Sequence, residues 1–243
     1  MSDPVKIILE EAKSAKKFIK KTPKKLFSVA VRYERGVGVK KDIKEAVRHF
    51  KLAADQGHDS SQFNLARYYA KGVGTAKNDI LAAKYYKLAA DQGHPKAQFN
   101  LAIYYAKGVI APKVPEKIIQ ENLAESSLET TTETIAKTVV KDLPKAPAKA
   151  VKYYKLSAAQ GYSKAQFALG RCYEDGVGVK KNLEEAVKCY KLAADQQHDK
   201  AQFNLARCYE NGIGVTKDLT QSAQYYKLAA DQGHASAKEK LAG

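Results

Sequence analysis

Apolar and small residues recur along the chain three or four positions apart, which is the spacing of one face of an amphipathic helix. One such series consists of Phe63, Leu65, Ala66 and Tyr69, and the next consists of Ala82, Tyr85, Tyr86, Ala89 and Ala90. Between the two series, Gly72-Val73-Gly74 interrupts the pattern, because glycine tolerates the positive φ that often ends a helix. The pattern therefore predicts a first helix, a tight turn and a second helix.

This helical pair is written several times in the sequence. The run Gln62-Phe63-Asn64-Leu65-Ala66-Arg67 returns 36 residues later at residues 98–102, and again at residues 202–207. A fixed period of this size indicates stacked units, none of which buries its apolar face alone. The pattern predicts an all-α solenoid of helix-turn-helix repeats. We place the five repeats at 25–60, 61–96, 97–164, 165–200 and 201–236.

Three segments depart from the regular repeat. Residues 1–24 place apolar side chains on one helical stripe, which predicts a capping helix over the first repeat. Residues at about 112–143 are inserted into the third repeat, where their spacing fits two short helices or a loop, with or without a function. Residues 237–243 begin a sixth repeat without its second helix, which favours an exposed end, self-association through that end, or truncation.

Particular residues are predicted to begin and end the second helix of each pair. Asp42, Asp79 and Asp218 stand where a side-chain oxygen caps the free N–H groups of this helix. The helix then ends in Asp-Gln-Gly-His or a close variant, and the fourth repeat carries Gln197 at the glycine position. If Gln197 adopts a left-handed conformation, it costs about 1 kcal/mol relative to glycine.

The repeated unit resembles the Sel-1-like repeat family, a branch of the tetratricopeptide superfamily. One repeat shows the motif at Ala165, Leu169, Gly170, Tyr173, Gly176, Gly178, Val179, Ala186, Tyr190, Ala193 and Ala194. The chain departs from the motif at Ala66, Ala102 and Ala206, where the family has glycine, and this exchange between small residues keeps a close helix contact possible. The resemblance implies a right-handed superhelical α/α solenoid and a role as a scaffold or adaptor.

Asn and Arg recur three positions apart on the first helix, which places each pair on one helical face. The amide of Asn can bond a peptide backbone and Arg can bind a carboxylate through two hydrogen bonds. In the related superfamily this helix lines the concave groove, so we predict binding of a peptide or protein there. The alternative is that these side chains only solvate the groove or contact neighbouring repeats. The predicted partner-binding residues are Asn64, Arg67, Asn100, Arg171, Asn204 and Arg207.

The histidines and cysteines, which could bind a metal ion or act in catalysis, lie at positions that recur from one repeat to the next. One position in the inter-repeat turn holds His58, His94, His198 and His234. Stacked repeats lie about 10 Å apart, so these imidazoles cannot share one metal ion and are predicted to be structural. Cys172 and Cys208 replace Tyr68, and Cys189 replaces Tyr85, so the three thiols are predicted to pack as small core residues. We predict no catalytic residue, no metal site and no cofactor.

The net charge of +16 would attract acidic proteins, nucleic acid and anionic surfaces alike. An electrostatic nucleic-acid or anionic-surface binder is therefore one alternative, and it depends on a lysine stripe along the second helices. The lysines of this stripe are Lys51, Lys87, Lys155, Lys191 and Lys227. No recognised nucleic-acid motif accompanies these lysines, so the sequence favours a protein or peptide partner. An acidic partner would suit the positive charge of the chain.

The remaining alternative is an enzyme or a small-ligand-binding protein that uses the insert as a lid over a closed polar pocket. Three cysteines leave at least one thiol unpaired, which favours a reducing compartment. The first residues lack an apolar signal region, and no apolar run approaches the ~20 residues of a membrane span. We therefore expect a cytoplasmic, non-enzymatic scaffold, with delivery into a host cell left open.

Overall fold

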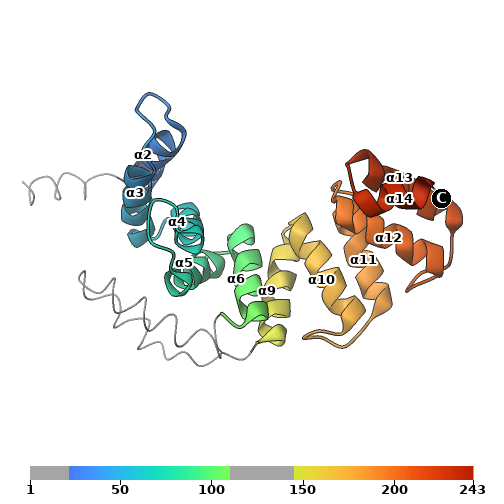
Figure 1. Ribbon diagram of the computed structural model, residues 1–243. Helices are drawn as coiled ribbons and strands as arrows, with labels where there is room; N and C mark the ends of the chain where they lie inside the picture. Colours follow the sequence, from blue (N-terminus) through green and yellow to red (C-terminus); the bar gives the residue numbers. More distant parts are fainter. Residues whose placement is uncertain (1–21, 110–144, 243) are drawn as a thin grey trace, which may run out of the picture. The chain divides into compact units, whose positions relative to one another are not determined.

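The computed structural model describes residues 22–109 and 145–242, and within these ranges the chain is helical without any strand (Figure 1). This confirms the predicted all-α class. The insert predicted at 112–143 lies outside the described residues, as does the capping helix predicted at 1–24 except for its last positions. The described helices are α2 (Pro23–Arg35), α3 (Ile43–Asp55), α4 (Asp59–Lys71), α5 (Asp79–Asp91), α6 (Pro95–Lys107), α9 (Pro147–Ala159), α10 (Ser163–Asp175), α11 (Leu183–Ala194), α12 (Asp199–Asn211), α13 (Leu219–Asp231) and α14 (Ala235–Ala242).

The chain divides into two compact units between Gln92 and Gly93. The first unit contains α2 to α5 and the second contains α6 to α14. In each unit, a helix that we name A packs against the following helix, named B, and B packs against the next A helix. The A helices are α2, α4, α6, α10, α12 and α14, and the B helices are α3, α5, α9, α11 and α13.

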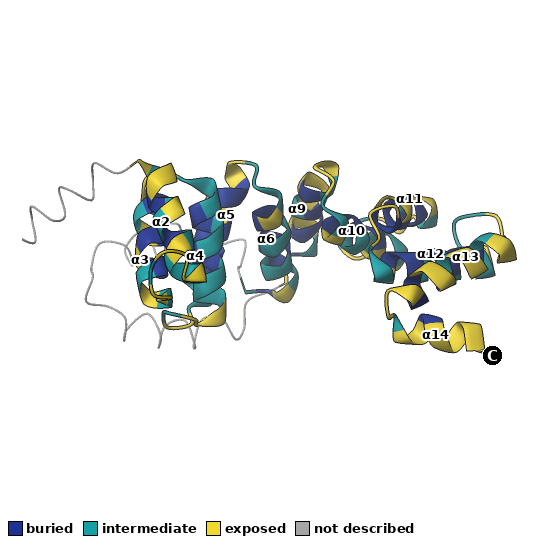
Figure 2. Cartoon of the chain, turned by 90° about the horizontal axis from the view of Figure 1, so that it is seen from above, coloured by how far each residue is buried: buried dark blue, intermediate teal, exposed yellow. Residues whose placement is uncertain are grey.

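The core follows the apolar pattern of the sequence. In the second repeat, Leu65 and Ala66 of the A helix are fully buried beside Ala82 and Tyr86 of the B helix. Alanine at these positions allows the two helices to approach closely, and tyrosine fills the space beyond them. Figure 2 shows the buried faces turned toward neighbouring helices, whereas α14 is exposed along most of its length and buries Ala237.

Side-chain caps begin the B helices α3, α5, α11 and α13, and one predicted cap was wrong. Asp42 and Asp218 accept backbone N–H groups of the first turn, as predicted. In the second repeat the cap is Asn78, whose side-chain oxygen accepts the N–H of Leu81 at 2.9 Å, and Asp79 is the first residue of α5. An asparagine oxygen caps a helix as well as a carboxylate does, and Asp79 still favours the positive end of the helix dipole.

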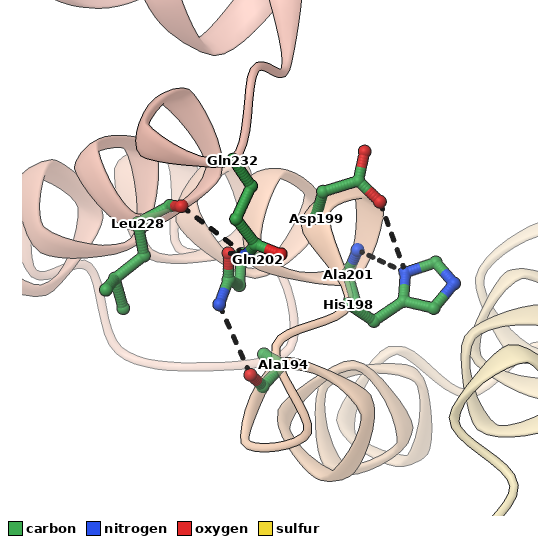
Figure 3. Close-up of polar contacts among 7 residues, drawn as sticks. All are labelled: Ala194, His198, Asp199, Ala201, Gln202, Leu228 and Gln232. Carbon is green, nitrogen blue, oxygen red and sulfur yellow. Dashed lines mark hydrogen bonds and ion pairs between the residues drawn. The ribbon is translucent and has the colours of Figure 1, made fainter.

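Buried glutamines of the A helices join neighbouring repeats within each unit. The side chain of Gln202 donates to the carbonyl of Ala194 in the preceding repeat at 3.4 Å and accepts from Gln232 of its own repeat at 2.6 Å (Figure 3). We name this arrangement the glutamine clamp. Its glutamine pairs are Gln92 with Gln62, Gln196 with Gln166, and Gln232 with Gln202, and Gln62 and Gln166 likewise donate to carbonyls of the preceding repeat. Gln160 and Gln98 form the same pair within the third repeat. The glutamine clamp fixes the distance between one B helix and the next A helix.

The turn between repeats contains a strained residue. Gln197 has a φ of 61°, and it is the one residue other than glycine with positive φ among those described. At the equivalent Gly57, Gly161 and Gly233, an added Cβ would meet nothing within 4 Å. The predicted left-handed conformation is therefore confirmed, and its cost comes from the backbone rather than from crowding.

The change Gln197→Gly is expected to raise the free energy of unfolding by about 1 kcal/mol, because glycine adopts positive φ without strain. Urea denaturation followed by circular dichroism measures this gain. The exposed neighbour Gln196 already makes a clamp hydrogen bond, so Gln196→Gly serves as a destabilising control. A Gln197→Gly variant that is no more stable than the natural chain would contradict the assignment of strain.

Candidate functional site

The predicted partner-binding side chains of the first unit are engaged with each other. The guanidinium of Arg67 donates to the Oδ1 of Asn64 at 3.1 Å, and the Nδ2 of Asn64 donates to the carbonyl of Ser60 at 3.0 Å. The guanidinium of Arg67 also lies over the ring of Phe63, 5.8 Å from its centre. The two residues share a helical face, as predicted, and this local bonding holds them in a defined position.

In the second unit the predicted residues also have local partners. Asn100 donates to the carbonyl of Lys96 at 2.8 Å, and Arg171 forms an ion pair with Asp175 at 3.6 Å. Arg207 binds Glu174 of the preceding A helix, and Glu174 also accepts the hydroxyl of Tyr190.

Asn204 lies near the same cluster. Burial and Glu174 raise the pKa of Tyr190, and Asn204 acts in the opposite direction. Arg207 and Asn204 therefore help to join the fourth and fifth repeats, whereas Arg171 lies on the open surface with more than half of its side chain exposed.

A hollow of about 470 Å³ lies beside α9, and a larger one of about 710 Å³ lies on the A-helix side of the second unit. We name the larger hollow the A-helix groove. Its apolar part comes from α6, α9 and α10, and its polar part comes from α10 and the start of α12. The apolar residues of these three helices in the lining are Phe99, Ile103, Ala106, Tyr154, Phe167 and Ala168, and Val177 adds to them from the turn after α10. Because Tyr154 is buried, its pKa is raised to about 12 and its hydroxyl stays neutral.

The groove is apolar because two repeats depart from the repeated sequence. Ile103 occupies the position that Arg67 and Arg207 occupy in other repeats. Ala168 likewise occupies the asparagine position of Asn64. The sequence prediction missed this site because it relied on the Asn and Arg residues that recur. The signal for the groove is instead the replacement of one of these residues by an apolar residue in each of two successive repeats. Of the predicted residues, Arg171 alone lines the groove.

Charged side chains surround the apolar part of the groove. Lys164 and Lys200 are exposed at the second residues of α10 and α12. Within the described part of the chain, neither lysine forms an ion pair. Asp175, which is paired with Arg171, and Asp199 are the carboxylates of the lining.

His198 lines the groove and caps α12. Its Nδ1 accepts the N–H of Ala201 at 3.3 Å (Figure 3). Its ring stacks on that of Phe167, with centres 4.9 Å apart. Burial lowers the pKa of His198, and Lys164 and Lys200 act in the same direction, although Asp199 opposes them. The ring is therefore neutral at pH 7, and with Nδ1 as acceptor its proton is on Nε2. His58 and His94 cap α4 and α6 in the same way, so these turn histidines are structural.

The repeat pattern and the helix pairs agree with a known family. The model of the Sel1 repeat matches residues 26–58, 59–94, 95–117, 141–162, 163–198 and 199–234. The chain belongs to the Sel1 repeat family. Sel1 repeat proteins generally mediate protein–protein interaction, and their fold is typically a non-enzymatic scaffold.

Solved Sel1 repeat structures support the same fold. A Sel1 repeat protein from Oxalobacter formigenes is 28% identical with a TM-score of 0.73, covering 96% of this chain and 84% of that one. The protective antigen c5321 of uropathogenic Escherichia coli, which displays the same fold, is 27% identical with a TM-score of 0.50, covering 90% and 48%. Among curated proteins, DAP3-binding cell death enhancer 1 of Rattus norvegicus is 57% identical over 37 residues. That match spans 15% of this chain and 7% of the relative.

In the regions that the structure covers, no three His, Cys, Asp or Glu side chains meet to hold a metal ion, and no helix is long and apolar enough to cross a membrane. The predicted lysine stripe is partly engaged, since Lys87 binds Asp91 at 2.7 Å and the ammonium of Lys155 lies 5.5 Å from the centre of the Tyr173 ring.

The three thiols are expected to differ in reactivity. All three are free, and burial raises the pKa of Cys189 and of Cys208 to about 11 each. Burial raises the pKa of Cys172 as well, but this thiol is only half-buried and lines the groove. Since the thiolate is the reactive form, we expect iodoacetamide at pH 8 to modify Cys172 at least about tenfold faster than the other two. Mass spectrometry of tryptic peptides measures the three rates, and equal rates would contradict the burial described here.

Proposed function

We propose that this chain is a non-enzymatic adaptor that binds a peptide segment of a partner protein in the A-helix groove. The observation that carries the proposal is the apolar lining around Ile103, at a position where other repeats carry arginine. Apolar surface gains about 25 cal/mol for each Å² removed from water, so a partner side chain that covers this lining is stabilised there.

The size and the lining of the groove support a peptide ligand. A volume of about 710 Å³ admits a few side chains, and the rings of Phe99 and Phe167 offer flat apolar walls. The family supports a protein partner in general. The curated relative that matches one repeat length is named for binding another protein, DAP3.

The predicted Asn and Arg residues remain part of the proposal as additional contacts. On the second unit, Asn100, Asn204 and Arg207 lie on the A helices that adjoin the groove. Asn64 and Arg67 offer an equivalent polar pair on the first unit. The free thiols favour a reducing compartment, and we propose the cytoplasm as the place where the adaptor acts.

Selection from a library of random 12-residue peptides displayed on phage tests the proposal, with the immobilised full chain as bait. Peptides that are enriched are then synthesised, and their affinity is measured by fluorescence polarisation. The variant Ile103→Arg/Ala168→Asn gives this position the residues found in other repeats, so it is expected to fold. We expect it to bind selected peptides at least about tenfold more weakly, because burial of one isoleucine contributes about 1.5 kcal/mol or more.

The matched control is Leu192→Arg/Ala223→Asn, which makes the same chemical changes at exposed positions of the B helices α11 and α13. Its affinity is expected to equal that of the natural chain. A bound peptide should also slow the modification of Cys172, which lines the groove. Absence of enriched peptides would contradict binding of linear segments, and equal loss in both variants would contradict the groove assignment.

A further inference from the structure

We propose that the A-helix groove selects acidic peptides, namely segments in which a bulky apolar residue is followed or preceded closely by Asp or Glu. This inference rests on the proposed function and specifies the chemistry of the partner. The apolar residue would occupy the lining formed by Phe99, Ile103 and Phe167, and the acidic residues would face Lys164 and Lys200.

The two lysines are available for a ligand. Each is exposed at the second residue of an A helix, and neither forms an ion pair with any residue in the described ranges. Both act on His198, which lies between the apolar lining and the start of α12, so their charges gather at one end of the groove. An acidic group bound there would gain from two cations without displacing an existing partner.

The placement of these lysines works against local helix stability. The first turn of a helix carries the positive end of its dipole, so a lysine there is less favourable than a carboxylate by several tenths of a kcal/mol. Three successive A helices of the second unit nevertheless carry lysine at their second residue, namely Lys96, Lys164 and Lys200. Helix N-termini and lysines together favour negative charge on a ligand.

His198 adds a hydrogen-bond donor to the same end of the groove. Since its Nδ1 accepts from Ala201, the neutral ring carries its proton on Nε2. That N–H can donate to a carboxylate of the ligand. The charged groups that line the groove are the cations Lys164, Arg171 and Lys200 and the carboxylates Asp175 and Asp199, which leaves an excess of one positive charge.

Arg171 is a third cation of the groove that can bind an acidic residue of the ligand, because its ion pair with Asp175 is weak. Its guanidinium lies 3.6 Å from Asp175, and both side chains are more than half exposed. Exposed pairs of this kind contribute about 0 to 1 kcal/mol, so Arg171 can turn to a second acidic residue of the ligand at small cost. The groove therefore suits an apolar residue with acidic residues near it, rather than a purely apolar segment.

The same phage library tests this inference through the sequences that it enriches. We expect peptides selected on the natural chain to contain Asp or Glu within about four residues of a Leu, Ile, Met or Phe. Their affinity should fall by about tenfold for Lys164→Glu/Lys200→Glu, and by about tenfold when the salt concentration rises from 50 to 500 mM, since exposed charges are screened. The control Lys180→Glu/Lys227→Glu changes the net charge equally at exposed positions elsewhere and should weaken binding by less than about twofold.

The outcomes separate this inference from the proposed function. If Ile103→Arg/Ala168→Asn abolishes binding but Lys164→Glu/Lys200→Glu leaves it intact, the groove binds peptides without selecting acids and the inference is wrong. Enriched sequences without acidic residues would overturn it as well. If the first variant leaves binding intact, the groove assignment itself fails. Circular dichroism of each variant establishes that a loss of binding does not come from unfolding.

Discussion

Replacement of Gly214 by alanine is expected to lower the free energy of unfolding by about 4 kcal/mol, as the sum of backbone strain and overlap between repeats. Gly214 has a φ of +66° in the loop between α12 and α13. A methyl group built on it would overlap the backbone carbonyl of Leu183, at the start of the preceding B helix. A backbone group at a helix start cannot turn aside as a side chain can, so the fourth and fifth repeats would have to separate.

Gly212 in the same loop provides the matched control. Its φ of +69° is nearly identical, but the nearest atom to an added Cβ is 3.6 Å away, which is ordinary contact. Gly212→Ala should therefore cost only the backbone strain of about 1 to 2 kcal/mol. Urea denaturation measures the free energy of unfolding of both variants. The difference between their losses gives the contribution of the contact between repeats. Equal costs for the two variants would show that the loop does not press on the preceding repeat.

The same loop contact recurs at earlier junctions. A Cβ on Gly178 would overlap the backbone of Pro147 at the start of α9, and one on Gly74 would lie 2.6 Å from the Cγ2 of Ile43. The second glycine of the turn, namely Gly74, Gly178 or Gly214, thus has a role between repeats that the first glycine lacks. The sequence explains both glycines through positive φ, but the close approach between repeats requires coordinates, because nothing in a single repeat shows which neighbour lies above it.

Much of the fold could be predicted because the repeat multiplies a weak local signal. The apolar positions of a single pair, such as Leu65, Ala66 and Tyr86, do not by themselves identify two packed helices. Their return every 36 residues identifies the helix pairs and their order. The prediction of a left-handed Gln197 succeeded for the same reason, since the glycine at equivalent positions reveals the backbone that Gln197 must adopt. The prediction for Asp79 failed because asparagine and aspartate are adjacent there and both can cap a helix.

The candidate site was harder to predict, because it depends on where the repeats differ. Asn64 and Arg67 recur and therefore attracted the prediction, yet recurrence is also what a structural role produces, as the pairing of Arg207 with Glu174 illustrates. Ile103 and Ala168 are inconspicuous in sequence. Their significance depends on the three-dimensional structure, in which Ile103 of α6 and Ala168 of α10 line the same groove.

The glutamine clamp leads to the second large effect, since Gln202→Glu is expected to cost about 3 kcal/mol at pH 7. Gln202 is 3% exposed, and its Nε2 donates to the carbonyl of Ala194. A carboxylate has nearly the same shape, so it could still accept from Gln232, but its second oxygen would face the Ala194 carbonyl as one acceptor against another. Burial and this carbonyl both disfavour the charged form and would raise the pKa of the introduced carboxyl group above the ordinary 4.3.

The pH dependence distinguishes this explanation from a general loss of packing. Below its raised pKa the introduced carboxyl group is protonated in the folded state, and its O–H can then donate to the carbonyl of Ala194 as the amide does. Relative to the natural chain, the variant should therefore be nearly as stable at about pH 4, and its deficit should grow as the pH rises through the raised pKa toward 7. Urea denaturation of both proteins at each pH measures the difference. The control is Gln56→Glu, because Gln56 is exposed and its repeat has Leu26 where later repeats carry the buried glutamine. Its cost should stay within about 0.5 kcal/mol, and a deficit of Gln202→Glu that does not change with pH would show that the carboxyl group is not buried against Ala194.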